Sequence, residues 1–226
     1  NYRSEDLNIK TPFLKALNEE GYTSPTPIQK ETIPLVLQGQ DLMGMAQTGT
    51  GKTAAFTLPI LQKLNANQST EKARDPRALI LAPTRELAIQ INESIRKYGQ
   101  YIAIKHTVVF GGVKQGPQVK SLTRGMDVIV ATPGRLLDLI NQGVCSLNKI
   151  QFFVLDEADR MLDMGFIRDV EKVIKLLPKQ RQTLFFSATM PESVIRFSET
   201  MLKSPVKVKV KSTLTPVERI SQSVIV

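Results

Sequence analysis

The stretch that decides the fold class lies near the start of the chain, where residues 41–53 read DLMGMAQTGTGKT. A short apolar run, Asp41–Met45, leads into a glycine-rich turn, and an amphipathic helical pattern follows that turn. Gly49 and Gly51 allow backbone N–H groups to turn inward. A strand, such a turn and a helix in this order predict a loop that surrounds a phosphate group.

Two side chains at the end of this stretch match the chemistry of a bound nucleotide. Lys52 supplies a positive charge for the β- and γ-phosphates, and the Thr53 hydroxyl can bind Mg²⁺. The usual loop pattern begins with glycine, whereas this chain has Ala46 at that position. The alternative interpretation is a glycine-rich strand–helix turn with an incidental lysine.

Six further apolar runs are separated from one another by helix-length segments. They are Arg77–Ala82, Lys105–Phe110, Asp127–Ala131, Gln151–Asp156, Gln182–Ser187 and Val206–Val210. Most of the runs are continuously apolar, which is typical of strands covered on both faces. The sequence therefore predicts an α/β fold, with a mostly parallel sheet of about seven strands and helices on both faces.

Local signals predict where some helices, loops and edges lie. Thr11, Thr26 and Thr132 each precede a proline, which predicts a capping residue followed by the first helical residue. Asn65–Pro76 is polar and predicts a surface loop. Val206–Lys211 alternates valine with lysine, which predicts an edge strand with one solvated face.

The composition excludes several classes of protein. Hydrophobic residues make up 42% of the 226 residues and charged residues 23%, as in soluble globular proteins. Cys145 is the only cysteine and His106 the only histidine, which excludes a disulfide framework and argues against a Cys/His zinc site. No run of 18 apolar residues occurs, so no membrane-spanning helix is expected. The net charge of +9 is weak evidence for a polyanionic partner.

A pair of acids follows the apolar residues Phe152–Leu155. Open α/β sheets bind ligands at the carboxyl ends of their strands, so Asp156 and Glu157 are expected beside the phosphate loop. There Asp156 would hold Mg²⁺, usually through water, and Glu157 would orient and deprotonate the attacking water. The alternative is that both acids simply begin a helix, where they suit its dipole.

Asp156-Glu157-Ala158-Asp159 spells the signature of the DEAD-box ATP-dependent RNA helicases. Other segments resemble motifs of that family in the same order. They are Gly21–Gln29, Ala46–Thr53, Pro83–Ala88, Gly111-Gly112, Thr132–Arg135 and Ser187–Thr189. The resemblance spans roughly Glu5 to Val210, and it implies that residues 1–211 form the first RecA-like, P-loop domain of such an enzyme, with a Q motif near residues 4–32. Residues 212–226 are expected to form a linker or the start of a second RecA-like domain.

The resemblance implies an adenine site around the Q motif. Gln29 is expected to hydrogen-bond the adenine edge with both halves of its amide, and Tyr22 to stack on the base. Gln29 also completes a capping box with Thr26, and both roles can hold together. The position of the family's upstream aromatic is Ser4 in this chain, and Tyr2 is the substitute candidate.

The resemblance also assigns the phosphate and metal contacts. The implied cofactors are ATP and Mg²⁺, and the implied catalytic residues are Lys52, Asp156 and Glu157. Thr53 and Asp156 are the implied metal residues. The phosphate loop is expected to contribute Ala46, Gln47, Thr48, Gly49, Thr50, Gly51, Lys52 and Thr53.

A second group of segments is expected to face RNA. By resemblance, contacts to the sugar–phosphate backbone come from Pro83, Arg85, Gly112, Thr132, Gly134 and Arg135. Such contacts carry no base code, so binding is expected to be independent of sequence. Met164-Gly165-Phe166 is a further candidate. For Arg85 the alternative is a salt bridge to Glu86 or Asp159, and the lysines of Val206–Lys211 are interpreted as a solvated edge.

The last motif is expected to couple the two sites. Ser187 and Thr189 are expected to hydrogen-bond Asp159, which would link phosphate chemistry to the RNA side. The alternative is an ordinary strand–helix junction with Thr189 as a cap before Pro191.

The family's second half carries a His-Arg-x-Gly-Arg string, which does not occur here. The chain is therefore expected to be the ATP-binding half of an ATP-dependent RNA helicase, a cytoplasmic monomer that is nearly inactive without its second RecA-like domain. The full-length protein is expected to couple RNA-stimulated ATP hydrolysis to sequence-independent duplex unwinding or ribonucleoprotein remodelling. Two rivals are a non-enzymatic RNA-binding module and a DNA-directed motor. Intact Lys52 and Glu157 argue against the first, and Gln29 and Asp159 against the second.

Overall fold

A computed structural model describes residues 7–210. Expectations for Tyr2, Ser4, Lys211 and residues 212–226 lie outside the described residues. The fold is built on a seven-stranded sheet in the order β3-β4-β2-β5-β6-β1-β7, in which every described strand pair is parallel. The strands are β1 (Leu42–Met45), β2 (Ala78–Leu81), β3 (His106–Val109), β4 (Val128–Ala131), β5 (Phe152–Leu155), β6 (Gln182–Ser187) and β7 (Val206–Lys209). The α/β fold class and all seven predicted strands are confirmed, and the sheet is wholly parallel rather than mostly so.

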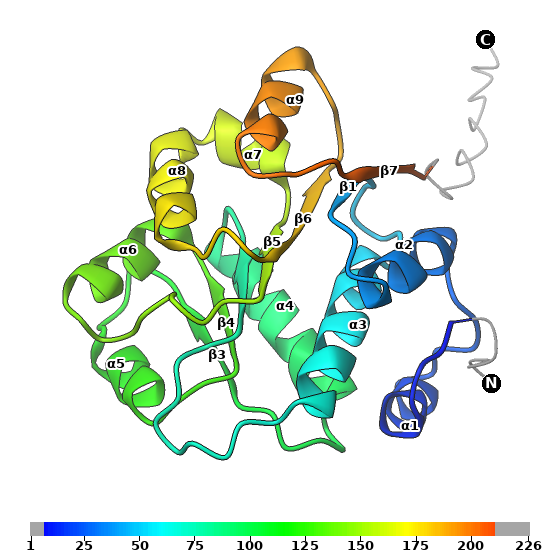
Figure 1. Cartoon of the computed structure of the whole chain (residues 1–226), viewed down its shortest axis with the longest axis horizontal. Coiled ribbons are helices and arrows are strands. Elements are labelled where there is room, and N and C mark those ends of the chain that lie inside the picture. The colour runs from blue at the N-terminus through cyan, green and yellow to red at the C-terminus, as the bar shows by residue number, and fades with distance from the viewer. Residues whose placement is uncertain (1–6, 211–226) are drawn as a thin grey trace, which may run out of the picture.

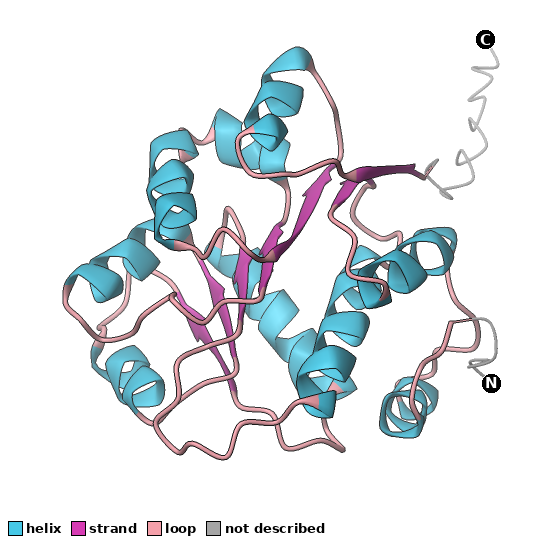
Figure 2. Cartoon of the chain, viewed as in Figure 1, coloured by secondary structure: helices cyan, strands magenta, loops and turns pink. Residues whose placement is uncertain are grey.

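Helices cover both faces of the sheet, as Figure 1 shows. One face carries α1 (Thr11–Glu19), α2 (Pro27–Leu37), α3 (Lys52–Ala66) and α4 (Arg85–Tyr98). The other face carries α5 (Gly116–Thr123), α6 (Pro133–Asn141), α7 (Ala158–Asp163), α8 (Ile167–Leu176) and α9 (Glu192–Glu199). Figure 2 shows the resulting three layers, with the strands between two layers of helices.

Most of the strands are continuously apolar because each of them contributes side chains to two cores. Ala78 and Ile80 of β2 belong to the core under α1–α4, whereas Leu79 and Leu81 belong to the core under α5–α9. Successive side chains of a strand point to opposite faces of the sheet. When both faces are buried, apolar side chains occupy both sets of positions, and the apolar–polar alternation of a half-solvated strand is absent. This two-sided burial holds the carboxyl ends of the strands in one row, where ligands bind in open α/β sheets.

The edge strand behaves as its alternation predicts. In β7, Val208 is buried, whereas Lys207 and Lys209 are exposed. β7 pairs only with β1 among the described strands. The exposed lysines of this strand are solvated, as expected of an edge with one wet face.

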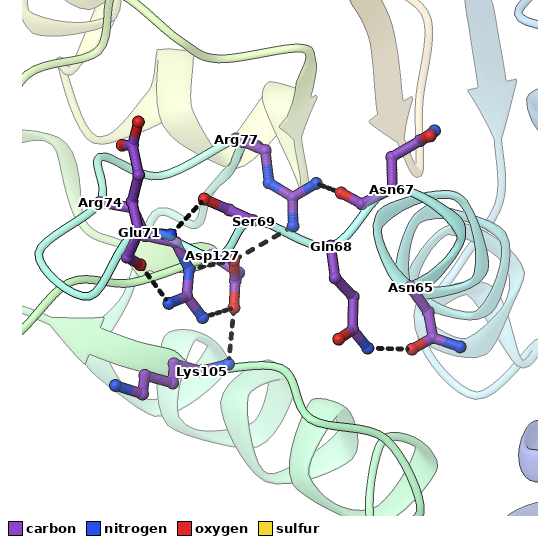
Figure 3. A network of polar contacts seen from close by, with 9 residues as sticks. All are labelled: Asn65, Asn67, Gln68, Ser69, Glu71, Arg74, Arg77, Lys105 and Asp127. Carbon is purple, nitrogen blue, oxygen red and sulfur yellow. Dashed lines mark hydrogen bonds and ion pairs between the residues drawn. The ribbon is translucent and has the colours of Figure 1, made fainter.

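The predicted surface loop Asn65–Pro76 is wrong at both ends. Asn65 still belongs to α3, and Pro76 is buried. The Arg74 side chain points toward Asp127 and forms a bidentate ion pair with its carboxylate, as Figure 3 shows. The polar composition of this segment predicts a solvated loop because Asp127, the partner of Arg74, lies 53 residues away along the chain.

One helix start also differs from the prediction. α1 is capped by Lys10 and begins at Thr11, so Thr11 is the first helical residue rather than the cap. Thr26 and Thr132 are the capping residues of α2 and α6, as predicted, each with proline at the first helical position. A threonine–proline pair fixes a helix start only to within one residue.

Candidate nucleotide-binding site

The phosphate loop joins β1 to α3 through two glycines with left-handed backbone conformations. Gly49 has φ +89° and Gly51 has φ +82°, and α3 begins directly afterwards at Lys52. A Cβ atom on Gly51 would lie 2.6 Å from Nε2 of Gln29, so a side chain has no room there. The loop therefore brings the start of α3, with its free N–H groups, to the carboxyl edge of the sheet.

Lys52 and Asp156 form a buried ion pair at this edge. Lys52 Nζ lies 2.7 Å from Asp156 Oδ1, and their side chains are 7% and 0% exposed. Burial raises the pKa of Asp156 above its ordinary value, and the neighbouring ammonium group of Lys52 acts in the opposite direction. The other carboxylate oxygen, Oδ2, is buried and has no hydrogen-bond partner among the described residues.

This unpartnered oxygen fits a magnesium site. Mg²⁺ is usually bound by one or two carboxylates together with substrate phosphates and water, not by a cage of protein ligands. In the described part of the chain no group of three or more His, Cys, Asp or Glu side chains could hold a metal alone. Thr53 lines the same cavity as Asp156, so a hydroxyl and a carboxylate are available to a metal that arrives with a nucleotide.

Glu157 follows β5 in a strained conformation. Its φ of +52° and ψ of +54° lie in the left-handed region, which is uncommon outside glycine. Thr48 Oγ1 donates to its Oε1 at 3.4 Å, and Arg160 Nη1 lies 3.2 Å from its Oε2. A strained backbone held by several contacts is a feature of functional sites, and here it carries a carboxylate in the cavity.

Gln29 ties the Q motif to the phosphate loop. Its Nε2 donates to the carbonyl oxygen of Gly51 at 3.1 Å, and its Oε1 accepts from the backbone N–H of Thr26 at the same distance. The side-chain amide thus helps to cap α2 and also holds the turn before α3. Contact with an adenine edge stays a prediction, and it requires these bonds to be exchanged or shared.

Tyr22 stands at the open end of the site and is 41% exposed. The Tyr98 hydroxyl donates to the Tyr22 hydroxyl at 3.2 Å, and the two rings are 6.0 Å apart at their centroids. The exposed ring is available to a flat base, which agrees with the predicted stacking role.

These residues surround one cavity of about 230 Å³. Of the predicted nucleotide and catalytic residues, those that line it are Tyr22, Gln29, Thr48, Gly49, Gly51, Lys52, Thr53, Asp156 and Glu157. Ala46, Gln47 and Thr50 do not line it, and the Thr50 hydroxyl instead donates to the Gln47 carbonyl at 2.7 Å. Five further residues line the cavity without having been predicted from the sequence: Ala54, Leu87, Gln90, Ser94 and Tyr98. Four of these lie on α4 at spacings of three and four, a pattern that could have indicated a second wall.

The predicted coupling residues are in contact. Thr189 Oγ1 and its backbone N–H donate to Asp159 Oδ2 at 2.9 and 3.2 Å, and the backbone N–H of Asp159 donates to Ser187 Oγ at 3.2 Å. The end of β6 is thereby bonded to the start of α7. Whether these bonds transmit a signal stays a prediction.

The predicted RNA-facing residues lie along the same edge of the sheet, beyond β5. Pro83 follows β2, Gly112 follows β3, and Thr132 and Gly134 follow β4. The strand order therefore places them side by side, away from the phosphate loop at β1. Gly112 has φ +80° and open space around it.

The two predicted RNA-binding arginines make no ion pair among the described residues. The Arg85 guanidinium lies 5.1 Å from the centre of the Phe110 ring, and the alternative salt bridges to Glu86 and Asp159 are not formed in residues 7–210. Arg135 donates to the Val113 carbonyl at 2.8 Å and to Gln118 Oε1 at 3.2 Å. Both positive charges remain available to an anion.

A parallel α/β sheet with a phosphate loop and an acidic pair at its carboxyl edge defines a RecA-like P-loop nucleotide-binding domain. The chain belongs to the DEAD/DEAH box helicase family, whose model matches residues 26–197. It is 46% identical over 219 residues to the ATP-dependent RNA helicase DeaD of Escherichia coli K12, covering 96% of this chain and 34% of that protein. It is 44% identical to the DEAD-box ATP-dependent RNA helicase CshA of Bacillus subtilis, covering 96% of this chain and 43% of that protein. The chain thus spans less than half the length of these relatives.

Solved structures agree with this assignment. A DEAD box protein from Methanococcus jannaschii matches 91% of this chain with a TM-score of 0.84 and 39% identity, over 55% of its own length. A hypothetical ATP-dependent RNA helicase from Sulfolobus tokodaii matches 88% of this chain with a TM-score of 0.79 and 36% identity, over 56% of its length. Among residues 7–210 no helix is both long and apolar enough to cross a membrane.

Proposed function

We propose that this chain is the ATP-binding domain of an ATP-dependent RNA helicase, which works together with a second RecA-like domain. The observation that carries the proposal is the buried Lys52–Asp156 pair, whose carboxylate keeps one oxygen without a partner among residues 7–210 at the phosphate loop. The printed names of the relatives, which are ATP-dependent RNA helicases, support the proposal. In the full-length protein the activity would be RNA-stimulated ATP hydrolysis coupled to duplex unwinding or ribonucleoprotein remodelling.

Each residue at the phosphate end has a distinct task in this proposal. The phosphate loop surrounds the β- and γ-phosphates, and Lys52 exchanges part of its contact with Asp156 for phosphate oxygens. Thr53 and Asp156 would hold Mg²⁺, and the bound ion would supply positive charge that neutralises the phosphates. Glu157 accepts the proton of the attacking water through its carboxylate, while Thr48 and Arg160 fix the orientation of that carboxylate.

The RNA side follows from the free charges and glycines beyond β5. Arg85 and Arg135 bind phosphates, while the backbone at Gly112 and Gly134 approaches the strand closely. The contact from Thr189 to Asp159 provides a path between this side and the ATP site. Binding by this domain alone should be weak, because two charged contacts imply a slope of only about −1 to −2 in log K against log salt concentration.

Hydrolysis by the isolated domain should be very slow. An arginine supplied to the transferring phosphoryl group typically accelerates the reaction by about 10³–10⁵-fold. That factor corresponds to roughly 4–7 kcal/mol of transition-state stabilisation, which Glu157 and Mg²⁺ do not replace because they act on the water and on the phosphate oxygens. We propose that the arginine comes from the second domain.

Calorimetry with ATP·Mg²⁺ tests the nucleotide site. Lys52→Ala should weaken ATP binding by about ten- to hundredfold, since hydrogen bonds to charged groups contribute roughly 1.5–3 kcal/mol. Equal affinities of the wild type and Lys52→Ala would refute the phosphate-loop assignment. Gln29→Ala should retain phosphate binding but lose the preference for ATP over GTP.

Mixing the domain with the separately expressed remainder of the full-length protein tests the helicase activity. RNA should stimulate ATP hydrolysis only when both parts are present. Glu157→Gln should keep ATP affinity and lose this hydrolysis, whereas a non-enzymatic RNA-binding module would show no hydrolysis to lose. Strong RNA-stimulated turnover by the isolated domain would contradict the two-domain proposal.

A further inference from the structure

Helix α4 presents two different faces. Ala88, Ile91 and Ile95 are buried in the core against the sheet. An adjoining stripe, formed by Leu87, Gln90, Ser94 and Tyr98, lines the nucleotide cavity, and its apolar members Leu87 and Tyr98 also pack on that core. Residues three and four apart lie on the same side of a helix, so this stripe is one continuous surface. α4 is therefore a wall of the cavity as well as a support of the sheet.

Two polar side chains of this stripe, Gln90 and Ser94, have no hydrogen-bond or ion-pair partner among residues 7–210. This distinguishes Gln90 from Gln29, whose amide is bonded at both ends to Thr26 and Gly51. An amide and a hydroxyl that face a cavity without a protein partner are available to a ligand in that cavity.

The direction of α4 orders these groups along the cavity. The helix begins just beyond β2, and the backbone N–H of Asp156 donates to the carbonyl of Leu81 at the end of β2. At its other end, Tyr98 contacts Tyr22. A helix rises about 1.5 Å per residue, so Gln90 lies about 6 Å closer than Ser94, along the axis of α4, to the helix end that follows β2. The stripe thus runs from the phosphate end of the site to the tyrosine at its base end.

We propose that Gln90 and Ser94 bind the nucleotide directly, opposite the Q motif. The Gln90 amide donates a hydrogen bond to a phosphate oxygen, and the Ser94 hydroxyl, one turn further along, bonds to a sugar hydroxyl. A neutral donor suits the position of Gln90, because a carboxylate there would repel the phosphates. This inference rests on the proposed ATP-binding function, and it assigns that function two residues on α4.

A charge placed at position 90 tests the phosphate contact. Gln90→Glu should weaken ATP·Mg²⁺ binding at least about tenfold in calorimetry, because a hydrogen bond to a charged group is lost and a repulsion is added. The loss should shrink as salt is raised. Adenosine, which has no phosphates, should bind Gln90→Glu as it binds the wild type.

Ile89→Glu is the matched control. Ile89 is the adjacent residue of α4, is 42% exposed and does not line the cavity, so the same charge is added to the same helix outside the site. Its ATP affinity should stay within about twofold of the wild type. Equal ATP affinities of Gln90→Glu and Ile89→Glu would overturn the phosphate contact, and so would an equal loss of adenosine binding in Gln90→Glu.

Ser94→Ala tests the sugar contact. The variant should bind ATP about threefold more weakly, the effect of one neutral hydrogen bond. With an ATP analogue that lacks both sugar hydroxyls, the wild type and Ser94→Ala should bind equally, and a remaining difference would overturn the sugar contact. Lys52→Ala distinguishes a failure of the α4 contacts from a failure of the proposed ATP-binding function. If Lys52→Ala loses ATP affinity while Gln90→Glu and Ser94→Ala do not, the α4 contacts are refuted and the proposed function stands.

Discussion

Two buried aspartates lie at opposite ends of the strands, Asp127 at the amino end of β4 and Asp156 at the carboxyl end of β5. They differ in how many hydrogen-bond partners their carboxylate oxygens have. Asp127 precedes β4, and both of its oxygens have partners (Figure 3). Arg74 donates to each oxygen at 2.7 Å, Arg77 to Oδ1 at 3.1 Å, and the backbone N–H of Lys105 to Oδ2 at 2.9 Å. Asp156 follows β5 and has Lys52 on Oδ1, while its Oδ2 has no partner among the described residues.

The two carboxylates titrate in opposite directions. Burial acts to raise the pKa of Asp127, but the bonds from Arg74, Lys105 and Arg77 outweigh it and hold that pKa below its ordinary value. Burial raises the pKa of Asp156, and Lys52 does not offset it. A buried carboxylate whose hydrogen bonds are complete stabilises the fold, whereas one with an incomplete set is held ready for a ligand.

Removing Asp127 should give the largest loss of stability. Asp127→Ala would leave Arg74 and Arg77, which are 12% and 10% exposed, without their carboxylate. Breaking a buried ion pair from one side costs about 3–5 kcal/mol, so the unfolding midpoint in urea should fall strongly. A loss below about 1 kcal/mol would contradict the structural role of this cluster.

The glycines beside the two sites should differ in the same way. A Cβ atom on Gly125 (φ +92°) would lie 2.3 Å from the carbonyl oxygen of Lys72 and 2.7 Å from the backbone nitrogen of Arg74, whereas a Cβ on Gly49 (φ +89°) would meet open space. Gly125→Ala should cost about 3 kcal/mol through overpacking and strain, and Gly49→Ala only about 1–2 kcal/mol through strain. Thermal unfolding measures both variants, and equal losses would contradict the tight packing at Gly125.

Asp156→Asn should separate stability from function. The substitution removes a carboxylate whose charged form is disfavoured by burial, and the Lys52 ammonium lines a cavity that solvent can enter. We expect the free energy of unfolding to fall by less than in Asp127→Ala, because one cation rather than two loses its carboxylate and that cation faces the cavity. ATP affinity in the presence of Mg²⁺ should fall by about 10–100-fold, as is typical when a residue that supports a metal is lost. An unchanged Mg²⁺ effect on ATP affinity would exclude Asp156 from the metal site.

The pH dependence of stability should have opposite signs at the two sites, and this is the smallest expected effect. The pKa of Asp127 is lowered on folding, so its contribution is present above the unfolded value of about 3.9 and disappears as the pH falls through the lowered pKa. The pKa of Asp156 is raised on folding, so the wild type should lose stability relative to Asp156→Asn as the pH rises through the raised pKa. Urea unfolding of the wild type, Asp127→Asn and Asp156→Asn across this range measures both trends. Parallel pH curves for the three proteins would contradict the two pKa shifts.

The sequence by itself determined the class of the fold and the ingredients of the site. Continuous apolar runs such as Phe152–Leu155 predict strands buried on both faces, and each such run became a strand. Two motifs could be predicted because each consists of neighbouring residues in the sequence. They are the turn from Gly49 to Lys52 and the acidic pair Asp156 and Glu157. The sequence shows these features directly because hydrophobic periodicity and turn conformation depend on residues that are close together in the chain.

The sequence predicted that Asp156 and Glu157 lie beside the phosphate loop, but only the tertiary structure decided which contacts they make. The order β5-β6-β1 places Lys52 against Asp156, and no local pattern contains that order. The inward fold of Arg74 onto Asp127 and the wall formed by Gln90 on α4 were missed for the same reason. A polar residue appears solvated in sequence until a distant strand or helix supplies its partner or its cavity. These contacts join residues that are far apart in the chain, and only strand order and helix packing bring such residues together.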